Sequence, residues 1–197
     1  MEIKSIMDQR RKRDQNTGGQ NRSPNPLVLD DVLKSGLEKA ASLAKAEKYK
    51  GAFDLLDQFC SNYPQEAQAF ATRAYVHAHK GNPSSAIADW SKAIELRANE
   101  PHFFLMRGIE FLKSAIPNNA ISDFTRVLDL CDHYDSNYYR SAAYLCRADG
   151  YLRLNKILEA RLDCERVPAS QRLWTDRLIS RESILAECAD REYGKDD

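Results

Sequence analysis

The chain has 197 residues, and its 29 Lys and Arg side chains balance 29 Asp and Glu side chains. A nucleic-acid binder usually carries a basic excess or a basic face, so this balance gives no overall reason to expect DNA or RNA as a partner. Gly and Pro are scarce while helix-favouring residues are plentiful, and the absence of an apolar run of about 18 residues excludes a conventional transmembrane helix.

The cysteine pattern and the N-terminus both indicate a reducing compartment. The cysteines are odd in number, widely spread and without a Cys-x-x-Cys pair. We therefore expect free thiols rather than a disulfide framework or a zinc site. The N-terminus is charged but has no apolar core behind it, unlike a secretory signal. The expected location is the cytoplasm, and neither a metal nor a cofactor is expected.

Residues 1–26 are polar and rich in Asn, Gln, Gly and Ser. Such a segment buries too little apolar surface to offset the entropy of an ordered chain, so a disordered tail is predicted. Its basic run, Arg10 to Arg13, has two interpretations. It is a contact for an acidic partner, nucleic acid or an import receptor, or it is simply a solvated tail.

A helical pattern begins near Leu27, where apolar residues recur at spacings of three and four. The clearest unit covers residues 67–100. Its first helix is predicted from about residue 68 to residue 80, and Gly81 ends it. Asn82 is a favourable N-cap and Pro83 suits the first position of a second helix.

The sequence of this unit recurs after 34 residues, which is typical of a repeat array. A polar insertion of six residues then delays the next unit to a shift of 40. A last helical segment is expected to cap the exposed face of the final repeat, and the chain end is expected to fray. The predicted organisation is a tail at 1–26, an array at 27–168 with repeats 33–66, 67–100, 101–140 and 141–168, a capping helix at 169–191 and a frayed end at 192–197.

This pattern resembles the tetratricopeptide repeat (TPR) family, whose helix–turn–helix units place small and aromatic residues at fixed positions. Small residues occur where the two helices of a hairpin approach closely, and aromatic residues fill the space between hairpins. The resemblance implies an all-α fold, a right-handed solenoid of helical hairpins with a C-terminal capping helix. The places that carry it include Phe70, Ala74, Ala86 and Trp90 in one unit and Phe104, Gly108, Phe111, Ala120 and Phe124 in the next.

Two charged columns recur in step with the repeats. They hold Arg73, Arg107 and Arg147, and Asp89, Asp123 and Asp163. One interpretation is a catalytic or ligand-binding dyad. The favoured interpretation is a structural ion pair between the two helices of each hairpin, because packing must recur in every repeat whereas chemistry seldom does. The planar guanidinium of Arg meets a carboxylate with two hydrogen bonds.

In the TPR family the first helix of each hairpin lines a concave groove. The apolar centre of this groove suggests that something covers it: a foreign helix or peptide, or the chain's own tail, unless the face is assigned wrongly. The residues that the resemblance places there as candidate partner contacts are Tyr75, His79, His102, Leu105, Met106, Ile109, Leu112, Lys113, Leu145, Asp149 and Arg153.

The sequence therefore predicts a non-catalytic adaptor that binds another protein, as a peptide or helix, in the groove. A dedicated chaperone or an immunity-type neutraliser is a specialised version, and a homo-oligomer is compatible with it. The alternative is an RNA-binding helical-repeat protein that uses the basic tail. No membrane partner is expected, and no phosphate-binding loop or nucleophile motif supports an enzyme.

Overall fold

The computed structural model describes residues 26–193. The predicted tail with its basic run, and residues 194–197, lie outside the described residues. The elements in chain order are α2 (Pro26–Lys45), α3 (Tyr49–Asn62), α4 (Ala67–His79), α5 (Pro83–Leu96), α6 (Pro101–Lys113), α7 (Pro117–His133), α8 (Arg140–Arg153), α9 (Ile157–Glu165), β1 (Arg172–Trp174), β2 (Leu178–Ser180) and α10 (Arg181–Tyr193).

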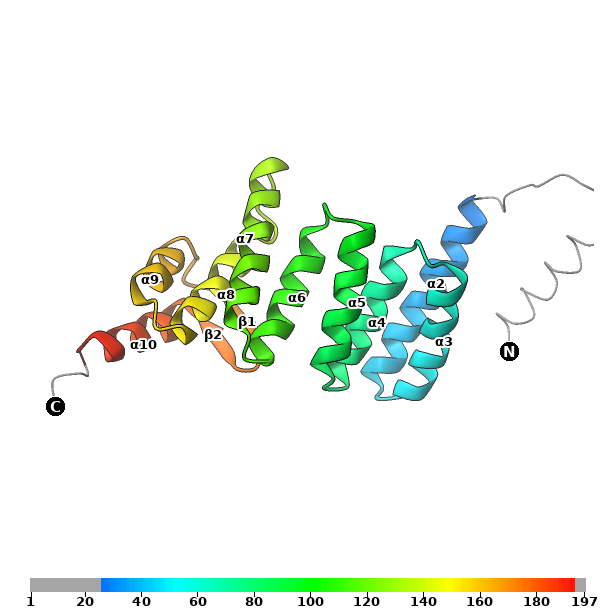
Figure 1. The fold of residues 1–197 in the computed structure, drawn as a ribbon, viewed down its shortest axis with the longest axis horizontal. Helices are drawn as coiled ribbons and strands as arrows, with labels where there is room; N and C mark the ends of the chain where they lie inside the picture. Colours follow the sequence, from blue (N-terminus) through cyan, green and yellow to red (C-terminus); the bar gives the residue numbers. More distant parts are fainter. Residues whose placement is uncertain (1–25, 194–197) are drawn as a thin grey trace, which may run out of the picture. The chain divides into compact units, whose positions relative to one another are not determined.

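The chain divides into two compact units, residues 1–35 and residues 36–197, and the second contains the repeat array. Within that second unit each helix from α4 onward packs against the helix before it (Figure 1). Contacts between neighbours in sequence are the mark of a solenoid of helical hairpins. None of the described helices is long and apolar enough to cross a membrane.

The turn inside each hairpin has the same backbone conformation. Gly81 adopts a φ of +79°, and Glu47, Ala115 and Asn155 have φ values of 58°, 56° and 59° at the equivalent places. This left-handed region favours glycine, yet glycine occurs at only one of these four positions. After Gly81, the Asn82 side chain accepts a 3.4 Å hydrogen bond from the Ser85 N–H and so caps α5.

The core residues lie at equivalent positions of successive repeats. Ala52, Ala86, Ala120 and Ala160 have no solvent exposure, and Trp90 and Phe124 are buried beside such small residues. The closest approach is at Gly108, where an added Cβ would lie 2.5 Å from Cε1 of Phe124. Glycine is needed here because the ring of Phe124 occupies the space that a Cβ would take.

The six-residue insertion is partly helical. The sequence predicted that the second helix of this hairpin ends near Leu130 and that residues 132–137 form a loop, whereas α7 continues to His133. The remaining residues form a short connection in which Asp135 has a φ of 48°. The insertion thus lengthens α7 and moves the start of α8 to Arg140.

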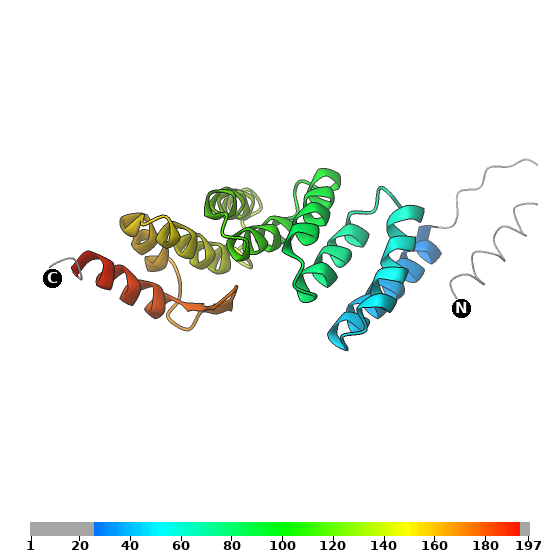
Figure 2. The same ribbon diagram turned by 60° about the horizontal axis from the view of Figure 1, so that its bottom comes forward.

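The prediction of one helical segment over residues 169–191 is wrong in its first half. Residues 172–180 form an antiparallel hairpin in which Leu173 pairs with Ile179. Its side chains alternate as in a strand, with Ile179 buried and Leu178 exposed. Helix α10 then packs on α8 and α9, which is the place of a capping helix (Figure 2).

Candidate partner-binding groove

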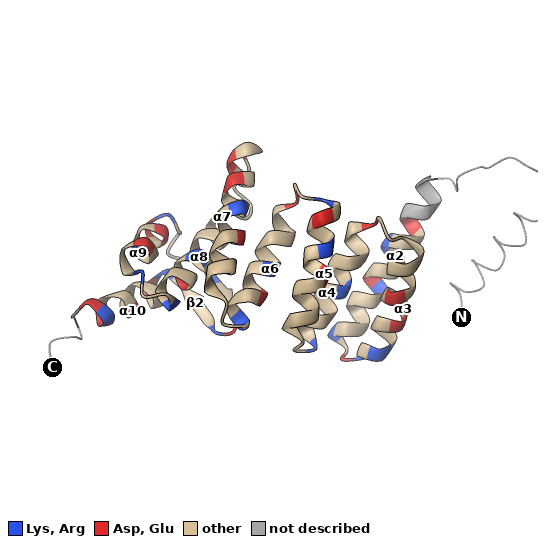
Figure 3. Cartoon of the chain, in the orientation of Figure 1, with Lys and Arg blue, Asp and Glu red and all other residues tan. Residues whose placement is uncertain are grey.

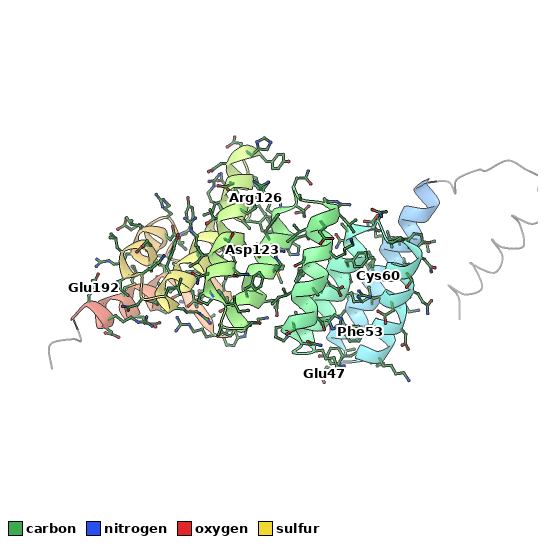
Figure 4. The ribbon with its side chains drawn as sticks, in the orientation of Figure 1. Glu47, Phe53, Cys60, Asp123, Arg126 and Glu192 are labelled. Atoms are coloured by element: carbon green, nitrogen blue, oxygen red, sulfur yellow. The ribbon has the colours of Figure 1, made fainter. Side chains whose placement is uncertain are left out.

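The α4–α5, α6–α7 and α8–α9 hairpins are each held by an Arg that bridges three helices. Arg107 of α6 donates from Nε and Nη2 to both carboxylate oxygens of Asp123 on α7, at 2.8 and 2.7 Å. Its third nitrogen, Nη1, donates to Ser91 Oγ on α5 at 3.0 Å. On α7, Asp123 is buried whereas Arg126 is exposed (Figure 4). The equivalent sets are Arg73 with Asp89 and Asp57, and Arg147 with Asp163 and Thr125.

Sequence reasoning missed this third contact. Asp57, Ser91 and Thr125 are spaced by 34 residues, so the same repeat register would have revealed them. The guanidinium of Arg107 also lies over the rings of Phe104 and Phe111, 5.8 and 5.7 Å from their centroids. With every guanidinium nitrogen hydrogen-bonded and at least one aromatic ring against each guanidinium, these Arg side chains hold the scaffold and offer little to a ligand.

Part of the expected groove is accessible. We use the name open groove for the half-buried side chains of Tyr75, His102 and Met106 together with the exposed side chains of His79 and Lys113. Tyr75 and Met106 pack on one apolar cluster that contains Trp90 and Phe103. The rings of Tyr75 and His79 lie 4.3 Å apart on α4. The open groove therefore joins α4 to α6 over a shared core.

The rest of the expected groove is core rather than surface. Leu112, Leu145 and Asp149 have no solvent exposure, and Leu105 and Ile109 are each 6% exposed. All except Asp149 belong to the apolar cluster that also contains Ile179 of β2. A partner cannot contact these buried side chains as the chain stands. At α8 the covering elements are the C-terminal hairpin and α10, which pack on that helix.

A network of charges fastens the hairpin to α8. Asp149 accepts hydrogen bonds from Arg153 Nε at 2.9 Å and from Arg177 Nη2 at 2.7 Å. Arg153 also contacts Asp176 in the hairpin turn at 2.5 Å, and its Nη1 donates to the Leu112 carbonyl at 2.9 Å. Arg153, predicted as a groove contact, is therefore occupied by the chain itself. Burial raises the pKa of Asp176, but Arg153 outweighs this and holds it below its usual value.

The cysteine thiols are not activated as nucleophiles. All five thiols are free and buried, and burial raises the pKa of each, for example that of Cys164 to about 12. Such thiols are poor nucleophiles at neutral pH. Across residues 36–193, acidic and basic side chains are interspersed along the helices (Figure 3). Among the described residues, no group of three or more His, Cys, Asp and Glu side chains could hold a metal ion.

Comparison with known proteins identifies the fold. No protein-family model matches the sequence, and no curated protein matches it. Solved TPR structures do match. YrrB, described as a TPR protein with an unusual peptide-binding site, is 16% identical with a TM-score of 0.63, covering 82% of this chain and 78% of its own. At this identity the likeness concerns the fold alone.

Two further matches are complexes with peptides. The Yersinia enterocolitica type III secretion chaperone SycD, bound to a peptide of the translocator YopD, is 16% identical with a TM-score of 0.56, over 64% of this chain and 95% of its own. The first TPR of Spaghetti (RPAP3), bound to an HSP90 peptide, is 19% identical with a TM-score of 0.55, over 65% and 94%. The expected TPR-like, helical-hairpin architecture is thus confirmed.

Proposed function

We propose that this TPR-like array is a non-catalytic adaptor that binds a peptide or helix of another protein on the open groove between α4 and α6. The observation that carries the proposal is the open groove itself. Tyr75 and Met106 are half-buried over one apolar core, whereas the equivalent face of α8 is already covered by the hairpin. Half-exposed aromatic and Met side chains combine adaptable apolar area with polar tips, which suits protein interfaces.

The similar structures support a peptide ligand. YrrB is described as having a peptide-binding site, and the SycD and RPAP3 structures contain bound peptides. The likeness to SycD also supports the narrower proposal of a dedicated chaperone. A cytoplasmic location fits the five buried free thiols. The RNA-binding alternative depends on the basic run, which lies outside the described residues, and a steep loss of affinity with salt would distinguish it.

A peptide-display selection on the immobilised chain tests this function. Peptides that are enriched on the wild type should bind the Met106→Glu variant at least about tenfold more weakly, because a carboxylate replaces apolar contact area. Leu158→Glu is the matched control, since Leu158 is 67% exposed on α9, outside the open groove. Circular dichroism melts establish that both variants are folded. Equal binding by wild type and folded Met106→Glu would contradict the proposal.

A further inference from the structure

The array repeatedly places a guanidinium between an aromatic ring and a carboxylate. Arg147 lies 5.6 Å from the Tyr144 centroid and 5.8 Å from that of Tyr151, while it pairs with Asp163 at 2.7 Å. Arg73 lies 5.6 Å from the Phe70 centroid in the same way. An Arg placed so gains both ring stacking and charge-assisted hydrogen bonds. These contacts show that an Arg guanidinium fits a site made of aromatic rings and a carboxylate.

A fourth set of rings lies at the edge of the open groove, beside the start of α6. The rings of Tyr138 and Tyr139 are 4.7 Å apart, and Tyr139 lies 5.8 Å from His102. His102 in turn meets the buried Trp90 edge-on at 5.9 Å. Both tyrosines belong to the connection that follows the inserted segment, so the departure from the 34-residue period places them here. Tyr138 is 83% exposed.

The acid of this set is Glu100, the N-cap of α6, whose carboxylate accepts a hydrogen bond from the backbone N–H of His102 at 3.4 Å. In the preceding repeat the equivalent Glu66 caps α4 and has Arg97 at 3.6 Å. The residue 34 positions after Arg97 is Cys131, which is buried and carries no positive charge. Within residues 31–192, no Lys or Arg lies within ion-pair distance of Glu100.

No Lys or Arg of the described residues occupies the space between Glu100 and these rings. The neighbouring Arg140 is engaged with Asp132 and Asn137. None of the described Lys or Arg groups lies over the rings of Tyr138 or Tyr139, unlike the rings of the hairpin core. The N-terminal end of the α6 helix dipole is positive and disfavours a cation at this position. The N-terminal end of α4 disfavours a cation equally, and Arg97 nevertheless contacts Glu66 there.

The electrostatics of the set are compatible with a cationic ligand. Burial lowers the pKa of His102, and the nearby Glu100 offsets this only in part. His102 is therefore neutral at physiological pH and does not repel a positive group. Burial and the charge of Glu100 both raise the pKa of Tyr139, which indicates that the carboxylate acts on this ring as well as on His102.

We infer that the bound partner supplies a basic side chain, Arg in preference to Lys, which sits between Glu100 and the rings of Tyr138, Tyr139 and His102. The inference rests on the proposed function and adds the chemistry of the partner, which is a basic segment. Arg is preferred because its planar, weakly hydrated guanidinium stacks on rings and meets a carboxylate with two donors.

An NMR titration tests the site with a defined probe, the peptide acetyl-Gly-Arg-Gly-amide. The indole N–H of Trp90 is the reporter, and that of Trp174, which is 71% exposed on the hairpin, is the internal control. We expect a saturable shift at Trp90 and His102 with Trp174 unchanged. The Lys peptide should bind more weakly, and the peptide with neutral citrulline should show no saturable shift.

Two substitutions sharpen the test. Glu100→Gln and Tyr138→Ala should each weaken binding of the Arg peptide about threefold to tenfold, because one removes the charge and the other an exposed ring. Glu95→Gln, on the exposed face of α5, should leave the affinity unchanged. Equal affinity for the citrulline peptide, or no loss in folded Glu100→Gln, would overturn the inference.

The inference and the proposed function fail in different ways. If displayed peptides depend on Met106 but carry no excess of Arg or Lys and tolerate Glu100→Gln, the groove binds peptides and the basic-site inference is wrong. If the Arg peptide binds at Glu100 while no displayed peptide depends on Met106, the basic site is correct and the proposed binding on the open groove is wrong.

Discussion

Arg177 Nη2 lies 2.7 Å from Oδ1 of Asp149, and this contact holds the C-terminal hairpin against α8. Asp149 has no solvent exposure, so its charge depends on Arg177 and Arg153 for compensation. Arg177 also contacts Glu187 at 2.9 Å and so links the hairpin to α10. Because of this fastening, the face of α8 is core, and the open groove ends at α6.

Replacing Arg177 by Ala is expected to loosen the hairpin. Asp149 would keep only Arg153, at a cost of ~1 kcal/mol because Arg177 is partly exposed and its pairs are screened by solvent. Hydrogen exchange at Leu173 and Ile179 should accelerate, while exchange in α4 and α5 should not change. Arg172→Ala, an exposed position on the same hairpin, is the control. Unchanged exchange in Arg177→Ala would show that the Arg177 contacts are not needed to hold the hairpin.

The Arg107–Asp123 pair is expected to behave as scaffold. Asp123→Asn should lower the free energy of unfolding by about 1.5–3 kcal/mol, because the half-buried guanidinium of Arg107 loses its charged partner. The exposed Asp129→Asn on the same helix should have little effect. Burial raises the pKa of Asp123 more than Arg107 lowers it, so desolvation is a substantial cost. The double replacement Arg107→Met with Asp123→Leu should therefore cost less than the sum of the single replacements, as urea unfolding would reveal.

Ala115 is expected to be a site of backbone strain. Its φ of 56° lies in the left-handed region, which costs a residue with a Cβ roughly 1–2 kcal/mol. Ala115→Gly should raise stability by about 0.5–1 kcal/mol, because the relief of strain exceeds the extra entropy of the unfolded chain. Ala88→Gly, on the exposed face within α5, should instead destabilise the fold by about 1 kcal/mol. If both changes destabilise equally in thermal melts, the strain at Ala115 is not significant.

Acid is expected to destabilise the array through His102 and His77. Burial lowers the pKa of both, so their folded values lie below the unfolded value of about 6.5. Above that pH both histidines are neutral in the folded and in the unfolded chain, so their titration does not reduce the stability. As the pH falls below it, the unfolded chain binds more protons and stability declines. The urea midpoint should drop between pH 7.5 and pH 5.5, and His102→Gln should show a smaller drop. An equal drop would assign the acid sensitivity elsewhere.

The scaffold was predictable from the sequence because repeated packing leaves repeated residues. The Arg–Asp columns, the small residues such as Ala86 and the turn at Gly81 all follow the 34-residue register. Even the contact from Arg107 to Ser91 could have been found in that register, since Asp57 and Thr125 occupy the matching places.

The end of the groove was not predictable in the same way. Leu145 and Asp149 occupy places that line a groove in the family, but a hairpin more than 20 residues later covers them, and that contact leaves no periodic signal. The hairpin itself is too short for a clear period-2 pattern, and its Leu and Ile residues also fit a helix. Tyr139, which meets His102, lies in the connection that follows the inserted segment, outside the 34-residue register.

Hydrogen exchange of the full chain with and without a display-selected peptide tests the central claim most directly. The account predicts slower exchange in α4 and α6 on binding, around Tyr75 and Met106, with no change on α9 around the exposed Leu158. Folded Met106→Glu at the same peptide concentration should lose this protection. Protection confined to α9, the hairpin or α10, with α4 and α6 unchanged, would contradict a binding site in the open groove.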